Sequence, residues 1–223
     1  MVTGQELNDD AARMRQEEAD YQREVREITE RAKADGTFMK APNGKPSNLD
    51  ERQWAHVRTT RFKKWFGDWE NDPENSSKVV DENGEPKVVY HGTGFNFTVF
   101  DTPPNMPRIF TSSSLDFAEG YGQAMKLFAN IRNPLTMDFE GRDAFELVNI
   151  DGRQLDDIEE LTLYAGKNGY DGVVARNVSD VGTHTSTLKL NDEYIVIRPN
   201  QLKSATENVG TYDINDNDIR FAI

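Results

Sequence analysis

The sequence predicts an α+β fold in which helices precede a mostly antiparallel β-sheet. Up to Asn71 the chain consists of polar helical stretches and turn-rich linkers, and from Lys78 onwards it changes to many short strands with few helices. Its 223 residues, 36% of them hydrophobic, suffice for one well-packed domain with an extension. We therefore predict a helical extension and linker over 1–47, a docked helix and connector over 48–77, and a strand-rich domain over 78–223.

The first segment is predicted to be a long helix from about Glu6 to Lys33. Its apolar side chains recur with alternating four- and three-residue spacing, which only Glu18 interrupts. These apolar residues are Leu7, Ala11, Met14, Tyr21, Val25, Ile28 and Ala32. We expect this face to pack on the rest of the chain, and docking onto a partner helix is the alternative. Residues 41–46, which include two prolines and a glycine, are typical of a linker.

A second helix is predicted from a cap at Ser47 or Asn48 to about Phe66, closed by Gly67. One side of it is bulky and apolar, with Trp54, Val57, Phe62, Trp65 and Phe66. So many aromatic side chains indicate that this helix is anchored to the domain that follows. Residues 71–77 are then a polar connector.

The strand-rich part begins with a hairpin in which 79–80 and 88–90 flank the turn at Asn83-Gly84. Short helices are predicted over 115–124 and 155–167. The remaining strands are expected at Arg108–Thr111, Lys126–Asn130, Leu135–Phe139, Gly172–Ala175, Thr187–Leu190 and Tyr194–Ile197.

Composition narrows the possible functions. The chain has no cysteine and three histidines, so we expect neither disulfides nor a metal site. A net charge of -13 disfavours a broad nucleic-acid face, although a nucleic acid held in a local groove remains an option. No stretch is apolar enough to span a bilayer, and the first residues lack the features of a secretory signal. We therefore expect a cytoplasmic protein without membrane contact.

Three fragments carry the chemically informative residues. The first is the strand Val89-Tyr90-His91-Gly92-Thr93, and the second is Ile109-Phe110-Thr111-Ser112-Ser113, followed by a helix that leads to Tyr121. The third, Asn191-Asp192-Glu193-Tyr194, places a carboxylate at the start of a strand. Each residue alone has an ordinary structural interpretation, as a strand-end histidine, a core tyrosine or a surface glutamate. Their joint order favours a site.

Together the fragments resemble the His-Tyr-Glu class of ADP-ribosyltransferases, the class of diphtheria toxin and the poly(ADP-ribose) polymerases. The order histidine, aromatic residue, tyrosine, glutamate is the same, and so is the spacing between Phe110 and Tyr121. Over 48–223 the chain is more closely similar to the ADP-ribosyltransferase domains of phage and mobile-element polyvalent proteins. The segments that carry this closer resemblance are 62–70, 169–174 and 203–210.

The resemblance implies a split β-sheet core and NAD as co-substrate. The nicotinamide of NAD is a flat cation, which would stack between Phe110 and Tyr121. Gly92 would let the backbone approach the carboxamide, and His91 would hold the adenosine-side ribose with help from Thr93. Thr111 and Ser112 complete the NAD-binding residues that the resemblance implies.

Glu193 is the catalytic carboxylate in this interpretation, with Tyr121 and His91 as its catalytic partners. It would stabilise the ribosyl oxocarbenium ion that forms when nicotinamide leaves. Phe110 departs from the tyrosine of diphtheria-type enzymes, which keeps the stacking and loses a hydroxyl. Asn191 stands where arginine-modifying relatives carry a second glutamate, which disfavours arginine as the acceptor.

The resemblance implies a mono-ADP-ribosyltransferase that modifies a protein or nucleic acid, as a phage or bacterial effector or toxin in the host cytosol. Two alternatives are an NAD glycohydrolase, with water as acceptor, and a non-catalytic module that binds a partner such as an antitoxin through the N-terminal helix. Of the other two histidines, we expect His184 in a loop and His56 in a structural role. The acidic run 156–160 is expected to be a solvated helix face.

Overall fold

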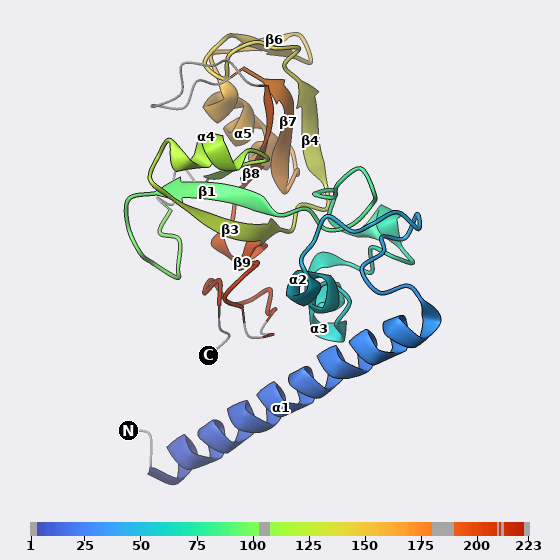
Figure 1. Cartoon of the computed structure of the whole chain (residues 1–223). Coiled ribbons are helices and arrows are strands. Elements are labelled where there is room, and N and C mark those ends of the chain that lie inside the picture. The colour runs from blue at the N-terminus through green and yellow to red at the C-terminus, as the bar shows by residue number, and fades with distance from the viewer. Residues whose placement is uncertain (1–3, 103–107, 180–189, 209, 211, 221–223) are drawn as a thin grey trace.

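The computed structural model describes residues 4–102, 108–179, 190–208, 210 and 212–220, with side chains described from Ala11 onwards. A long helix lies below a mixed domain built on one large sheet (Figure 1). The helices are α1 (Gly4–Asp35), α2 (Glu51–His56), α3 (Thr60–Phe66), α4 (Leu115–Glu119) and α5 (Ile158–Lys167), with 3-10 turns η1 (Pro73–Asn75) and η2 (Pro199–Gln201). The strands are β1 (Val89–Thr93), β2 (Ile109–Ser112), β3 (Gln123–Ala129), β4 (Pro134–Asp138), β5 (Val148–Ile150), β6 (Arg153–Leu155), β7 (Gly172–Val178), β8 (Asn191–Val196) and β9 (Leu202–Ser204).

Seven strands form the main sheet in the order β4-β7-β8-β2-β1-β3-β9. Every neighbouring pair is antiparallel except β4 and β7, which run parallel with the helix α5 in the connection between them. The strands β5 and β6 form a separate hairpin. The prediction of an α+β fold with a mostly antiparallel sheet, short helices and a helical N-terminal extension is confirmed.

The sheet is split between β1 and β2. These two described strands share a single register pair, Tyr90 opposite Ser112. On either side of this junction pairing is extensive, with five pairs between β1 and β3 and four between β2 and β8. The two halves of the sheet therefore diverge from one point, and the helix α4, which follows β2 in the chain, contacts β1, β2 and β3.

The single helix predicted over 48–66 is wrong, because the chain forms α2 and α3 with a break at 57–59. Thr59 adopts an extended conformation, and its hydroxyl accepts the backbone N–H of Phe62, which caps α3. A side-chain oxygen at such a position competes with continued helix. The start of α2 carries a full capping box between Asp50 and Gln53.

Two other predicted helices are shorter than expected. The helix expected to continue to Ala124 stops at Glu119, and Gly122 then adopts a φ of 129°, which returns the chain as β3. The helix expected from Leu155 begins at Ile158, because Asp157 accepts the Glu160 N–H and caps it there. Leu155 belongs instead to β6.

Most predicted strands occur with shifted ends, and three short ones, β5, β6 and β9, were missed. The turn at Asn83-Gly84 is present, but residues 79–80 contribute an isolated bridge from Val80 to Pro86 and no full strand. The strand expected at Thr187–Leu190 lies outside the described residues, apart from Leu190, which belongs to no strand.

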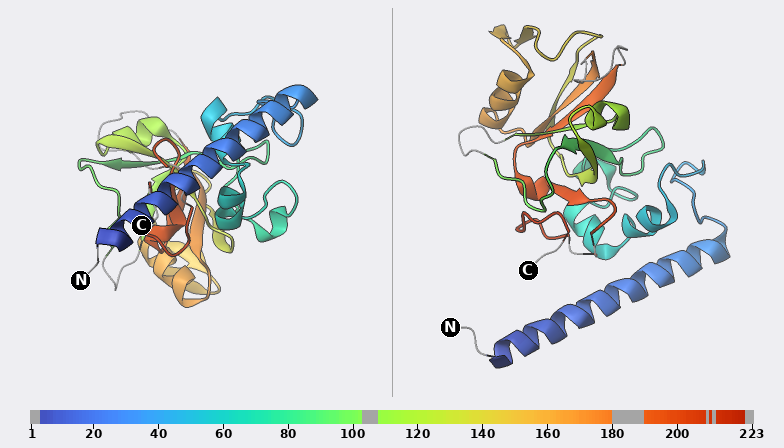
Figure 2. Two further views of the ribbon diagram at one scale, coloured as in Figure 1. Left: turned by 90° about the horizontal axis from the view of Figure 1, so that it is seen from below. Right: turned by 60° about the vertical axis from the view of Figure 1, so that its left-hand side comes forward.

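The helix α1 packs on α2 and on the C-terminal segment through the second half of its apolar stripe (Figure 2). Tyr21 is buried there, its hydroxyl lies 2.5 Å from Nδ1 of His56, and its ring lies against Gly210. Val25, Ile28 and Ala32 continue the contact into the aromatic cluster below the sheet. Among the apolar residues of α1 that precede Glu18, Ala11 is half-buried and Met14 is exposed. The side chain of Leu7 lies outside the described part of the chain.

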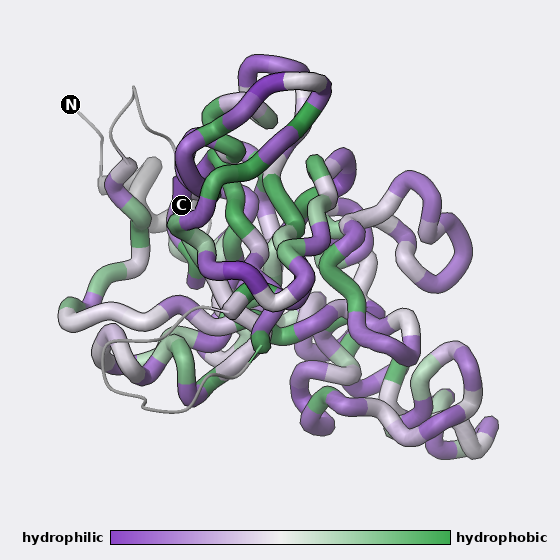
Figure 3. Tube along the Cα trace, turned by 90° about the horizontal axis from the view of Figure 1, so that it is seen from above, coloured by the Kyte–Doolittle hydropathy of each residue, from purple (hydrophilic) through white to green (hydrophobic). Residues whose placement is uncertain are grey.

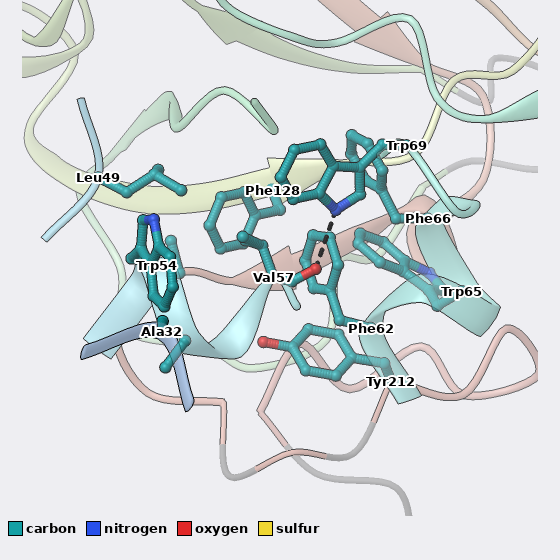
Figure 4. Close-up of a cluster of buried hydrophobic side chains, with 12 residues drawn as sticks. Ala32, Leu49, Trp54, Val57, Phe62, Trp65, Phe66, Trp69, Phe128 and Tyr212 are labelled. Carbon is teal, nitrogen blue, oxygen red and sulfur yellow. Dashed lines mark hydrogen bonds between the residues drawn. The ribbon is translucent and has the colours of Figure 1, made fainter. Parts of the chain in front are cut away.

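The aromatic cluster joins the N-terminal helices to the sheet and to the chain's end (Figure 4). Phe62 packs edge-on against Phe128 of β3 and against Tyr212, at ring-centre distances of 5.2 and 5.0 Å. The indole N–H of Trp69 donates to the carbonyl of Val57. Because these contacts come from distant parts of the chain, the helices before β1 are built into the same core as β3.

Hydrophobic residues gather in the middle of the fold, and hydrophilic residues follow the outer loops (Figure 3). In the part of the chain that the structure describes, no helix combines the length and apolar character that a membrane span requires.

Candidate active site

A cavity of about 320 Å³ opens where the two halves of the sheet diverge. It is lined by β1, β2 and β8, by α4 and Tyr121, and by the loop before β5 together with the start of α5. The predicted site residues that line it are His91, Gly92, Phe110, Thr111, Ser112, Tyr121 and Glu193. The fold therefore brings together residues that are far apart in the sequence.

Thr93 does not line this cavity. It is the last residue of β1 and lines a neighbouring cavity of about 680 Å³ with Phe95 and Gln123. His184 lies outside the described residues. His56 is buried between α1 and the C-terminal segment, away from the residues that line the first cavity.

Glu193 lies on β8, in the half of the sheet formed by β4, β7, β8 and β2. Its neighbours across the strands are Ser112 on β2 and Ala175 on β7, so the carboxylate comes from the middle of the larger half-sheet. The residue is only 3% exposed, yet it lines the cavity. A carboxylate held in low-dielectric surroundings acts strongly on any positive charge that develops beside it.

His91 lies on the opposite side of the junction, on β1. Its Nδ1 lies 2.8 Å from the carbonyl oxygen of Phe110. A carbonyl can only accept, so Nδ1 carries the proton and donates. Burial lowers the pKa of His91 below its usual value, which favours the neutral ring, whereas the hydrogen bond to Phe110 opposes this effect. In the neutral ring Nε2 is then a hydrogen-bond acceptor, suited to a hydroxyl.

Gly92 allows α4 to lie directly on β1. A Cβ atom on this residue would stand 1.9 Å from the carbonyl oxygen of Ala118 and 2.9 Å from Cβ of Tyr121. The glycine thus sets the position of α4, and with it the aromatic residues Phe117 and Tyr121 that face the cavity.

The hydroxyls on β2 fix the strand to its neighbours. Thr111 donates to the carbonyl of Tyr194 at 2.7 Å. Ser112 donates to Oδ1 of Asn191 at 2.7 Å and accepts the backbone N–H of Ser114, the cap of α4. This chain of hydrogen bonds ties the helix that leads to Tyr121 to the strand that carries Glu193.

Seven residues that line the cavity were not predicted as site residues: Tyr90, Phe117, Ala118, Ala144, Phe145, Ile158 and Glu159. Glu159 belongs to the run 156–160, which was expected to be a solvated face. That expectation fails here, because Glu159 lines the cavity and its carboxylate accepts a hydrogen bond from the guanidinium of Arg108. No local pattern marks Phe145, since it enters the wall from the loop before β5.

Residues 81–212 match the family model described as ADP-ribosyltransferase in polyvalent proteins. The chain belongs to this family. The matched range contains β1 to β9 and every residue that lines the cavity. Searches of curated proteins and of solved structures gave no match.

Membership makes the cavity the candidate active site of an ADP-ribosyltransferase domain, a family whose co-substrate is NAD. The match begins after α1, α2 and α3, at the turn before β1. The aromatic cluster nevertheless places α2 and α3 against β3, inside the matched range. The ADP-ribosyltransferase domain of this chain thus packs on helices that lie outside the matched range.

Proposed function

We propose that the chain is a mono-ADP-ribosyltransferase of the His-Tyr-Glu class. It cleaves the bond between nicotinamide and ribose in NAD and transfers ADP-ribose to a macromolecule. The observation that carries the proposal is the convergence of His91, Tyr121 and Glu193 on one cavity from three separate elements. Because the chain resembles the ADP-ribosyltransferase domains of phage and mobile-element polyvalent proteins, we propose that the domain acts as an effector of phage or bacterial origin.

Nicotinamide would bind between Phe110 and Tyr121. Both side chains line the cavity, one from β2 and one from the turn after α4, and the cationic ring would stack on their faces. Phe117 packs edge-on against Tyr121 at 5.4 Å between ring centres and so supports it. Tyr121 is 46% exposed in the structure, and a bound nicotinamide would cover part of that apolar surface.

His91 would hold a ribose hydroxyl. The bond to the carbonyl of Phe110 fixes the proton on Nδ1, so Nε2 can accept from the sugar. This role requires a neutral ring, which burial favours. The backbone on either side of Gly92 would contact the carboxamide of nicotinamide. This edge of β1 is accessible for that contact because β1 pairs with β2 only at Tyr90.

Glu193 would act on the donor ribose. Departure of nicotinamide leaves positive charge on the ribosyl oxygen and anomeric carbon, and a carboxylate already fixed in a buried position stabilises it without reorganisation. The acceptor nucleophile then forms the new bond to the anomeric carbon and gives up its proton. With water as that nucleophile the same cavity would act as an NAD glycohydrolase.

The test is to incubate the purified chain with NAD labelled in the ADP-ribose part, with and without bacterial lysate, beside Glu193→Gln and a control, Glu74→Gln. Glu74 is an exposed carboxylate on η1. We expect label on a macromolecule with the wild type and the control, and a loss of about 100-fold or more in Glu193→Gln. Thermal unfolding of each variant checks that the fold is retained.

If free ADP-ribose is the sole product even in the presence of lysate, the chain hydrolyses NAD and the proposed transfer to a macromolecule is wrong. Absence of both NAD turnover and NAD binding would refute the enzymatic proposal and leave the non-catalytic binding module.

A further inference from the structure

We propose that the acceptor is a protein with a basic surface, which docks on the two lips of the cavity. The inference rests on the proposed function and names its substrate class. The first lip is α4 with Tyr121, and the second is the loop 143–147 with the first turn of α5.

Both lips expose apolar side chains. Phe145 is 68% exposed, and Leu147 beside it is also exposed. On the other lip, Leu115 begins α4 and Tyr121 follows its C-cap, and both are exposed. Phe145 and Tyr121 line the cavity itself. Isolated exposed apolar residues are ordinary, but several on the two lips of one cavity mark a contact surface for a macromolecule. A small acceptor such as water would have no use for them.

Both lips are also acidic. The carboxylates on them are Asp116 and Glu119 on the first lip and Asp143, Glu146, Asp156, Asp157, Glu159 and Glu160 on and beside the second. Two cations of this region, Arg108 and Arg142, are engaged within the chain. Arg108 is paired with Glu159, and Arg142 donates to the carbonyls of Phe139 and Leu147.

An apolar surface flanked by carboxylates complements lysine and arginine side chains. It opposes a nucleic acid, whose phosphates would meet the same carboxylates. With NAD in the cavity, the acceptor would meet the lips and not the cavity floor. The charges on the lips therefore select the acceptor, and a basic protein surface is the class they favour.

The test uses a charge-reversal variant, Glu119→Lys with Glu146→Lys, which changes one exposed carboxylate on each lip. Its matched control is Glu30→Lys with Glu74→Lys, which makes the same change in net charge on α1 and η1. Each protein is incubated with labelled NAD and bacterial lysate. The labelled products are divided by protease and nuclease sensitivity, and the labelled proteins by cation exchange. Calorimetry with NAD alone measures donor binding by each variant.

We expect protease-sensitive label in proteins retained by the cation exchanger. The lip variant should lose roughly tenfold of this incorporation relative to its control, with NAD affinity unchanged. Nuclease-sensitive label would overturn the inference, and so would equal incorporation by the two variants or label without preference for basic proteins. Release of ADP-ribose without any labelled macromolecule would also overturn it. Failure of the wild type to bind or turn over NAD would instead refute the proposed function.

Discussion

Gly92 offers the sharpest test of how the site is assembled. Substitution by alanine places a Cβ atom 1.9 Å from the carbonyl oxygen of Ala118, where carbon and oxygen in contact need about 3.3 Å. The obstacle is main chain, so β1 and α4 must separate by about 1.4 Å. A shift of about 1 Å in a positioning element can cost about 100-fold in rate. Overpacking of this kind also costs about 1–3 kcal/mol of stability.

The expected result for Gly92→Ala is a loss of NAD turnover of about 100-fold. A lower unfolding midpoint should accompany it, by about 2–4 °C for each kcal/mol lost in a chain of this size. The control is Gly94→Ala, because a Cβ atom on Gly94 has no atom within 4 Å. Turnover assays and thermal scans on both variants check the prediction. Full activity of Gly92→Ala at an unchanged midpoint would show that α4 does not depend on this close approach.

Three further predictions concern stability. Burial lowers the pKa of His56 to about 4, so between pH 6.5 and 4 this histidine is protonated in the unfolded chain and neutral in the folded chain. As the pH is lowered through this window, the free energy of unfolding should fall by up to about 3 kcal/mol more in the wild type than in His56→Gln. Urea unfolding at each pH measures this, and parallel plots of unfolding free energy against pH for the two proteins would contradict it. Glu85 is fully buried and pairs with Arg58 at 2.7 Å, so Glu85→Ala should cost about 3–5 kcal/mol by the same unfolding assay, and a loss under 1 kcal/mol would show that the pair is dispensable. A fragment from Lys78 onwards should aggregate because Phe128 loses its cover, whereas a soluble, cooperatively folded fragment in light scattering and thermal scans would show that α2 and α3 are accessory.

The sequence was most informative where a pattern is local. Alternating apolar residues and turn signals located most strands of the main sheet, and the fragments around His91, Tyr121 and Glu193 located the cavity. The strand ends were less accurate, because pairing with neighbours extends a strand beyond its apolar residues. Gln123, for example, belongs to β3 through its pairing with Thr93.

What failed depended on contacts between distant residues. Thr59 could continue a helix or cap a new one, and a side-chain hydrogen bond to the Phe62 N–H decides the outcome. Phe145 and Glu159 reach the cavity only because the connection from β4 to β7 folds back over the sheet. No spacing within the sequence encodes that approach.

The contacts of Tyr21 have a consequence for how the chain is made. Its ring lies against Gly210, and its hydroxyl shares His56 with Tyr212, so the packing of α1 is completed by residues that are translated much later. Until these residues leave the ribosome, α1 and the aromatic side chains of α3 lack a lasting partner. Contacts between residues so far apart in the sequence form slowly, and the partly folded chain exposes apolar surface until they form. During synthesis, α1 and α3 therefore form a segment that a chaperone would have to protect until Gly210 and Tyr212 are available.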